Sequence, residues 1–375
     1  MNWKNWRNET VGVIQRVDAV DLFRFFVLFF MIQGHLFRAY LLPAIRLEHW
    51  YKLHETLHGL VAPGFLFSAG FAAFLSFHNK RQNYIHFDRA FFKRLRRILF
   101  VIAIGYWIHL PFFSLRKTLR FVSQGQAGEF LKTDILQCIG VGLLLFTFFA
   151  VALKNEKIVA AISVLAGALF FLLPETVKTI HLHPAVDSYF NYNVSTFPIF
   201  PWAGFLFVGV IAAYAYVLLK KEIFFRSILV LGIVFFPWFF FKSSQVYFKA
   251  ELTLTGNLNK IAGVFLLLWL SDWLLRRCQG PLTSVLIKAG TESLFIYVLH
   301  LFVIFNSIFG FGLKPVFQNS LHVPQALLLF LAIALVVFVL ALGYNWLKEK
   351  RPFAWRVVFN IFWVAFLLLF AIKPH

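Results

Sequence analysis

The chain has 375 residues, of which 60% are hydrophobic, 14% are charged and 51 are Phe. This composition excludes an ordinary soluble domain, which is roughly half apolar and a quarter charged. The formal net charge of +20 would suit a nucleic-acid-binding protein. However, the Lys and Arg residues lie in short clusters between apolar runs, as in membrane-protein loops, so no nucleic-acid partner is expected. With two cysteines, Cys138 and Cys278, no disulfide or thiolate-metal framework is indicated.

Apolar runs of membrane-spanning length follow one another along the chain. Each is close to the ~20 residues that a helix needs to cross the hydrocarbon core. The predicted spans lie at 20–42, 60–77, 98–114, 134–153, 157–173, 200–219, 224–241, 260–275, 285–308, 324–346 and 354–372. They predict an all-α polytopic membrane protein, a single domain over 1–375, with about eleven transmembrane helices (10–12).

The distribution of basic residues predicts a cytoplasmic N-terminus. The segments 1–19 and 78–97 are both basic, and Lys and Arg are enriched in cytoplasmic loops. The basic segment 116–132 opposes this orientation. The N-terminus lacks a cleavable signal peptide, so the first apolar run is expected to remain as a helix. We therefore expect an integral, multi-pass protein of a bacterial inner membrane, with the lipid bilayer as its first partner.

The first span carries two ionisable residues on one face. Arg24 and His35 are eleven residues apart, which is about three helical turns and roughly 16 Å along the axis. Asp18 and Asp21 could pair with Arg24. Charged groups at membrane depth are costly and mark functional sites by default. The alternative is that Arg24 snorkels to the headgroups and His35 is an interfacial histidine.

A histidine-rich loop follows the first span. It contains His49, His54 and His58 together with Glu48 and Glu55. Histidine titrates near neutrality, so it can act as a general base or carry an acyl group as a nucleophile. The i, i+4 spacing of His54 and His58 would also suit zinc on a helix. No HExxH pattern or third ligand accompanies them, so no metal is expected.

Other candidate residues have a structural reading beside the functional one. Asp134 could bind an acceptor or cap a helix together with Gln137. His300 could line a cavity shared with the first span or pack between helices. Arg94 and Arg97, in the basic segment, could attract phosphates or only supply the positive-inside signal.

Four sequence blocks, in order along the chain, resemble the heparan-α-glucosaminide N-acetyltransferase family and its bacterial relatives, within the transmembrane acyltransferase superfamily. They are Ala62-Pro-Gly-Phe-Leu-Phe-Ser-Ala-Gly70, Asp134-Ile-Leu-Gln-Cys-Ile-Gly140, Phe197-Pro-Ile-Phe-Pro-Trp-Ala-Gly204 and Gly290-Thr-Glu-Ser-Leu-Phe-Ile-Tyr-Val-Leu-His300. In addition, Arg24 followed by ten residues and His35 resembles the Arg-x10-His signature of the acyltransferase-3 proteins. The blocks span almost the entire chain.

The resemblance implies transfer of an acyl group, expected to be acetyl, from cytoplasmic acetyl-CoA to a hydroxyl or amine of a sugar-like acceptor across the membrane. By position, the family's active histidine falls at His49. Its catalytic asparagine falls at His35, a departure that matches the acyltransferase-3 pattern instead, so either histidine could be the base. A homodimer is also plausible from the resemblance.

The remaining candidate residues divide between the two substrates of this reaction. Those expected to bind the acyl-CoA donor are Arg24, Arg94 and Arg97, and those expected to bind the glycan or glycolipid acceptor are His54, Glu55, His58, Asp134 and His300.

A transporter or flippase for a polar or lipid-linked solute is the main alternative. Arg24 and His35 would then lie on the translocation path. The predicted spans are continuous and show no inverted repeat, which weighs against this alternative because many transporters use paired broken helices.

Overall fold

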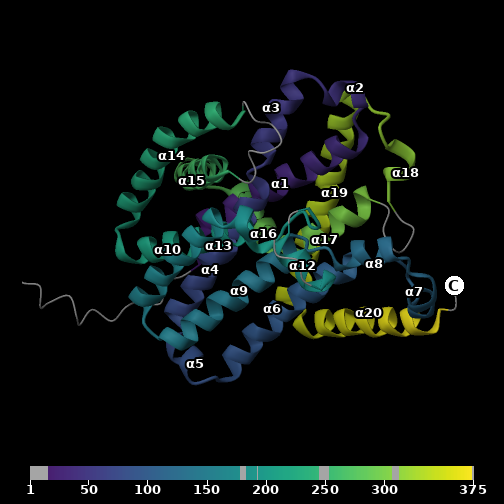
Figure 1. Ribbon diagram of the computed structural model, residues 1–375, viewed down its shortest axis with the longest axis horizontal. Helices are drawn as coiled ribbons and strands as arrows, with labels where there is room; N and C mark the ends of the chain where they lie inside the picture. Colours follow the sequence, from purple (N-terminus) through teal and green to yellow (C-terminus); the bar gives the residue numbers. More distant parts are fainter. Residues whose placement is uncertain (1–15, 178–182, 192, 245–252, 306–311, 374–375) are drawn as a thin grey trace, which may run out of the picture.

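The computed structural model describes residues 16–177, 183–191, 193–244, 253–305 and 312–373. Within these ranges the regular structure is helical, apart from one isolated bridge between Leu41 and Leu321. The helices pack side by side into a bundle, with α20 lying along one edge (Figure 1).

The long helices follow the predicted spans in order. They are α1 (Asp18–Tyr40), α4 (Val61–Asn79), α6 (Arg89–Ile108), α9 (Ile135–Leu153), α10 (Glu156–Leu172), α13 (Ile199–Leu218), α14 (Lys221–Ser244), α15 (Leu254–Arg277), α16 (Pro281–Thr291), α17 (Ser293–Ile304), α19 (Val323–Lys350) and α20 (Pro352–Ile372).

Short helices connect them. They are α2 (Pro43–Arg46), α3 (His49–His58), α5 (Arg81–Ile85), α7 (Leu115–Phe121), α8 (Gln124–Leu131), α11 (Pro174–Val177), α12 (Pro184–Phe190) and α18 (Lys314–Phe317). The histidine-rich segment predicted as a loop is therefore largely helical, and α3 presents His54 and His58 one turn apart.

Seven helical segments of the described residues are long and apolar enough to cross a membrane, or eight if the bent pair α16–α17 is one span. Three other predicted spans fall on α6, whose first half is basic, on α10, which has 17 residues, and on α14. The protein is thus an integral, multi-pass membrane protein. The total of about eleven spans and the cytoplasmic N-terminus stay predictions, and residues 1–15 of the basic N-terminal segment lie outside the described residues.

The span predicted at 285–308 is not continuous, so this expectation was wrong. Helices α16 and α17 meet at an angle of 78°. Glu292, at the break, is buried. Its Oε1 accepts a hydrogen bond of 2.8 Å from Asn345 Nδ2 and pairs with Lys348. A carboxylate inside an apolar bundle needs such partners. The break between α16 and α17 places Glu292 where it reaches Asn345 and Lys348. Residues 306–308 of the predicted span lie outside the described residues.

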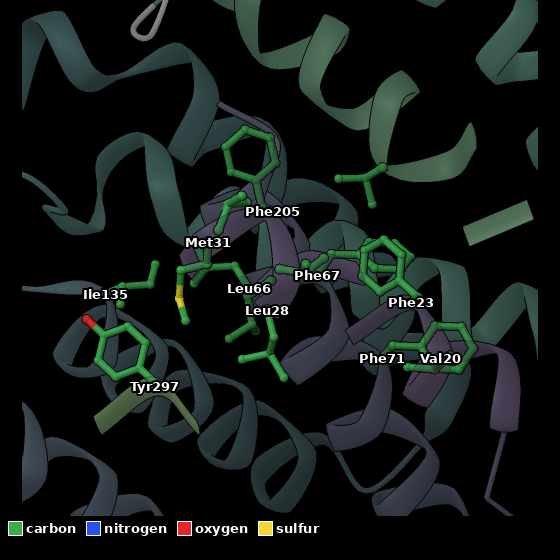
Figure 2. Packing of buried hydrophobic residues seen from close by; sticks show 14 of the residues in the cluster. Val20, Phe23, Leu28, Met31, Leu66, Phe67, Phe71, Ile135, Phe205 and Tyr297 are labelled. Carbon is green, nitrogen blue, oxygen red and sulfur yellow. The ribbon is translucent and has the colours of Figure 1, made fainter. Parts of the chain in front are cut away.

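Helix α1 runs through the centre of the bundle and packs against α3, α4, α15, α16, α17 and α19. Its inner face is aromatic and aliphatic, and Figure 2 shows Phe23 beside Phe67 of α4, with ring centroids 6.1 Å apart. Helix α4 also crosses α13 at very close range, because Gly70 faces the Leu206 carbonyl and Gly209 faces the Phe67 carbonyl. Such small-residue contacts are typical of helix pairs in membranes.

Candidate active site

Arg24 points into the bundle, toward α4. Its Nη1 lies 3.1 Å from Asp21 Oδ1, and its Nη2 donates a 2.8 Å hydrogen bond to the Ser68 carbonyl of α4. The Arg24 side chain is 18% exposed and that of Asp21 is 2% exposed. Asp21 also pairs with Arg16. Arg24 is therefore a partly buried cation with a carboxylate partner inside the bundle, which weighs against the snorkelling alternative.

His35 lies at the centre of a cluster of three imidazoles. Its ring centroid is 5.3 Å from that of His300 on α17 and 6.3 Å from that of His58 on α3. Helices α3 and α17 thus meet at the C-terminal half of α1. Gly34 makes the approach of α3 possible, because a Cβ built on Gly34 would overlap the His58 imidazole.

The protonation of the cluster follows partly from its hydrogen bonds. His300 Nδ1 lies 3.0 Å from the Ile296 carbonyl oxygen, and since a carbonyl only accepts, Nδ1 carries the proton. The opposite nitrogen, His300 Nε2, and His58 Nε2 are both buried, and neither has a hydrogen-bond partner among the described residues. Buried polar atoms normally have partners. Both nitrogens are therefore available to a substrate, to water or to a transferred proton.

Two further contacts hold α3 against α1. His54 Nε2 donates to Gln33 Oε1 at 2.7 Å, and Arg38 Nη2 donates to Glu55 Oε2 at 2.5 Å. Of the residues predicted to bind an acceptor, His58 and His300 flank the predicted base His35. His54 and Glu55 instead contact Gln33 and Arg38 on α1. Gln33, Gly34 and Arg38 were not singled out from the sequence, although their positions next to His35 on α1 were a usable signal.

Asp134 caps α9 and also contacts residues next to the imidazole cluster. It begins α9 with a capping box, in which its backbone N–H donates to Gln137 Oε1 at 3.2 Å. Its Oδ2 also accepts a 2.6 Å hydrogen bond from the Tyr297 hydroxyl and lies 3.5 Å from His109 Nε2. The Tyr297 ring is 5.5 Å from that of His300, so Asp134 is one residue removed from the imidazole cluster.

A cavity of about 230 Å³ connects the Arg24 region with Tyr297. Its walls come from α1, α4, α6, α9, α16 and α17, and Figure 2 shows Tyr297 beside Ile135 at one part of the lining. The polar lining consists of Arg24, Ser68, Thr291, Ser293 and Tyr297. The remaining lining is apolar, so the cavity suits an amphipathic chain with a few polar groups.

Three further predicted residues, His49, Arg94 and Arg97, also lie outside the imidazole cluster and the cavity lining. His49 is exposed at the first residue of α3, about 13 Å along the helix from His58. Arg94 pairs with the Tyr84 hydroxyl and packs over the Tyr84 and Phe146 rings. Arg97 is exposed one turn before Val101, which lines the cavity.

Among the residues that the structure describes, no three His, Cys, Asp or Glu side chains are arranged to hold a metal ion. His54 and His58 do stack, with ring centroids 6.1 Å apart, but His54 Nε2 is already bound to Gln33.

Comparison with known families gives one match. The family model described as heparan-alpha-glucosaminide N-acetyltransferase, catalytic, matches residues 16–232, which is more than half of the chain. The matched range contains Arg24, His35, α3 and Asp134, whereas His300 lies beyond it. No curated protein matches the chain.

Proposed function

The chain belongs to the heparan-alpha-glucosaminide N-acetyltransferase catalytic family, and we propose that it transfers an acetyl group from cytoplasmic acetyl-CoA to a hydroxyl or amine of a sugar-like acceptor outside the membrane. The family is one of membrane acetyltransferases. The donor, the acceptor side and the bacterial inner membrane as its location are parts of the proposal.

One observation carries the proposal: Tyr297 lines the cavity that contains Arg24 and also contacts the ring of His300, which packs against His35. Acyl transfer needs a base for the acceptor, a site for the donor chain and a path between the two faces. The ring contacts of His35 with His300, and of His300 with Tyr297, bring the base next to the cavity.

We assign His35 as the general base and His58 and His300 as its neighbours at the acceptor. His35 takes the proton of the acceptor O–H or N–H, and the acceptor atom forms a bond to the acyl carbon. The bond between that carbon and sulfur then breaks, and the thiolate of CoA takes the proton from the imidazolium. His49 is the second candidate, but its exposed position at the start of α3 makes it suited to binding the acceptor.

The donor is held from the cytoplasmic side in this proposal. Arg24 lines the cavity, and Arg97 lies one turn from the cavity-lining Val101 on α6, where it can attract phosphates. Arg94 is engaged with Tyr84, so we assign it a structural role first and a donor role second.

The test is release of free CoA by the purified protein in nanodiscs, with acetyl-CoA and glucosamine-bearing oligosaccharides as probes. We expect His35→Ala to lose at least 100-fold in turnover while it still binds acetyl-CoA, and His49→Ala to lose less. Equal activity of His35→Ala and wild type would remove His35 as the base. A folded wild type that binds no acyl-CoA would reject the enzyme.

The broken span α16–α17 favours transport as a second candidate, because transporters bind substrates at discontinuous helices. Uptake of labelled acceptor into proteoliposomes without acetyl-CoA would support this alternative. Transfer of labelled acetyl to the acceptor without net movement of the acceptor would oppose it.

A further inference from the structure

The start of α15 is polar although it is buried. Asn257, Asn259 and Lys260 are 0%, 5% and 8% exposed, and all three lie in the first two turns of the helix. Removing an amide or an ammonium group from water is costly unless the group is paired. The segment also lies beyond residues 16–232, which the family model matches. Its polarity therefore needs an explanation from this chain itself.

The Asn257 amide is unpaired at both of its polar atoms. Neither Oδ1 nor Nδ2 has a hydrogen-bond partner among the residues that the structure describes. An amide offers one acceptor oxygen and two N–H donors, and buried polar groups nearly always use them. Asn345, which is 6% exposed, shows the usual behaviour, because it donates a 2.8 Å hydrogen bond to Glu292 Oε1. The Asn257 amide is thus suited to a polar group that comes from outside the protein.

Asn257 lies near the helix end that carries His58. Lys260 Cε is 3.8 Å from the position that a Cβ on Gly59 would take, and Gly59 follows His58 directly. Lys260 Nζ also lies 5.1 Å from the centroid of the Trp202 ring on α13. Residues three apart are neighbours on a helix surface, so Asn257 lies on the same side of α15 as Lys260, about 4.5 Å along the axis.

The paired donor and acceptor atoms of an amide suit a sugar. Two adjacent hydroxyl groups of a sugar ring present a donor and an acceptor side by side, and one asparagine amide can bind both. A simple alcohol or amine presents only one such group. His58 flanks the proposed base His35, and Asn257 lies on the far side of the α3 end from that base. A sugar unit has the width to contact both regions, with its reactive group at His35.

We propose that Asn257 selects the acceptor: its amide binds two adjacent hydroxyls of the sugar unit that receives the acyl group. The acceptor class is a sugar with a vicinal diol beside its reactive hydroxyl or amine, and α15 forms one wall of the acceptor site. This inference rests on the proposed acyl transfer and concerns only how the acceptor is chosen.

Acetyl transfer to methyl glucosaminide and to its 3-deoxy, 4-deoxy and 6-deoxy analogues tests the proposal on the full-length protein in nanodiscs. The 3-deoxy and 4-deoxy sugars each lack one hydroxyl of the diol beside the amine. We expect their kcat/KM to be at least about tenfold below that of the parent sugar, because a site built to bind a hydroxyl rejects an analogue without it. The 6-deoxy sugar keeps the diol and should react within about threefold of the parent.

Each outcome has one reading. Equal use of all four sugars overturns the inference and leaves the acyltransferase intact. Transfer to none of them by a folded protein rejects the proposed function itself.

Asn257→Leu separates acceptor recognition from stability. The variant keeps the approximate volume of the side chain and removes its polar atoms. We expect kcat/KM for the parent sugar to fall at least about tenfold, and the 3-deoxy and 4-deoxy sugars to react as well as the parent. Binding of acetyl-CoA should be unchanged. Because no hydrogen bond within the described part of the protein is lost, the melting temperature without sugar should stay the same or rise by about 2–4 °C.

Asn345→Leu is the matched control, because it also replaces a buried asparagine but removes the hydrogen bond to Glu292. Its melting temperature should fall by about 2–4 °C, and discrimination against the 3-deoxy and 4-deoxy sugars should remain. An equal fall in the melting temperature of Asn257→Leu, with that discrimination retained, would assign the Asn257 amide to the fold and overturn the inference.

Discussion

The imidazole of His58 on α3 lies directly against Gly34 on α1, in the space where any other residue would carry its Cβ. Since Gly34 precedes His35, this contact sets how closely the histidine-bearing helix α3 approaches the proposed base.

We expect Gly34→Ala to displace His58 and reduce acetyl transfer at least tenfold. The added methyl should also cost about 1–3 kcal/mol of stability, the usual cost of overpacking. Gly343→Ala is the matched control, because its Cβ would meet open space and a helical Gly→Ala change is neutral to stabilising. Thermal melting and CoA release measure the two effects. Full activity in Gly34→Ala would show that the position of His58 is unimportant.

The ion pair of Arg38 with Glu55 is expected to hold α3 over the cluster. The side chains are 55% and 26% exposed, so each single replacement should cost below about 1 kcal/mol. Turnover should fall clearly, whereas the free energy of unfolding should change little. The double exchange Arg38→Glu with Glu55→Arg should recover part of the lost turnover. A double-mutant cycle of turnover without coupling would count against this positioning role.

The two basic residues of α6 are expected to respond differently to neutralisation. Arg94→Gln removes a hydrogen bond and two ring contacts. It should lower the free energy of unfolding by about 1–2 kcal/mol, and the melting temperature should fall with it. Arg97→Gln, at an exposed position, should change stability by about 0.5 kcal/mol or less. It should raise the KM for acetyl-CoA several-fold. Opposite results would exchange the structural and donor roles of the two residues.

The break between α16 and α17 should depend on Glu292. Replacing Glu292 by Ala leaves Asn345 and Lys348 without their shared acceptor, and we expect a loss of about 1–3 kcal/mol. Glu349→Ala is the control, because Glu349 is exposed on α19 next to Lys348. Because Thr291 and Ser293 flank Glu292 and line the cavity, acetyl-CoA binding should weaken together with stability. Equal melting temperatures for both variants would contradict this account.

Most of the site could be predicted from the sequence, because Arg24 and His35, at the two ends of the site, lie on one helix. The Arg-x10-His spacing placed Arg24 and His35 on one face of α1, and His58 and His300 were also named as candidates. Gly34 and Gln33 were missed, since a glycine and an amide become informative only when the partner helix that faces them is known. The continuous span at 285–308 was wrong, because hydropathy averages over a single buried carboxylate.

The sequence by itself determined the class of the protein: hydropathy and the distribution of charge are local properties, and they already require an integral membrane bundle of helices. Helix spacing along α1 likewise needs no tertiary information, because it follows from 3.6 residues per turn. Only the tertiary structure decided that Arg24 faces α4, that α3 brings His58 onto Gly34, and that α17 brings His300 to His35. These contacts join residues up to hundreds of positions apart, and they depend on how closely particular helices can cross.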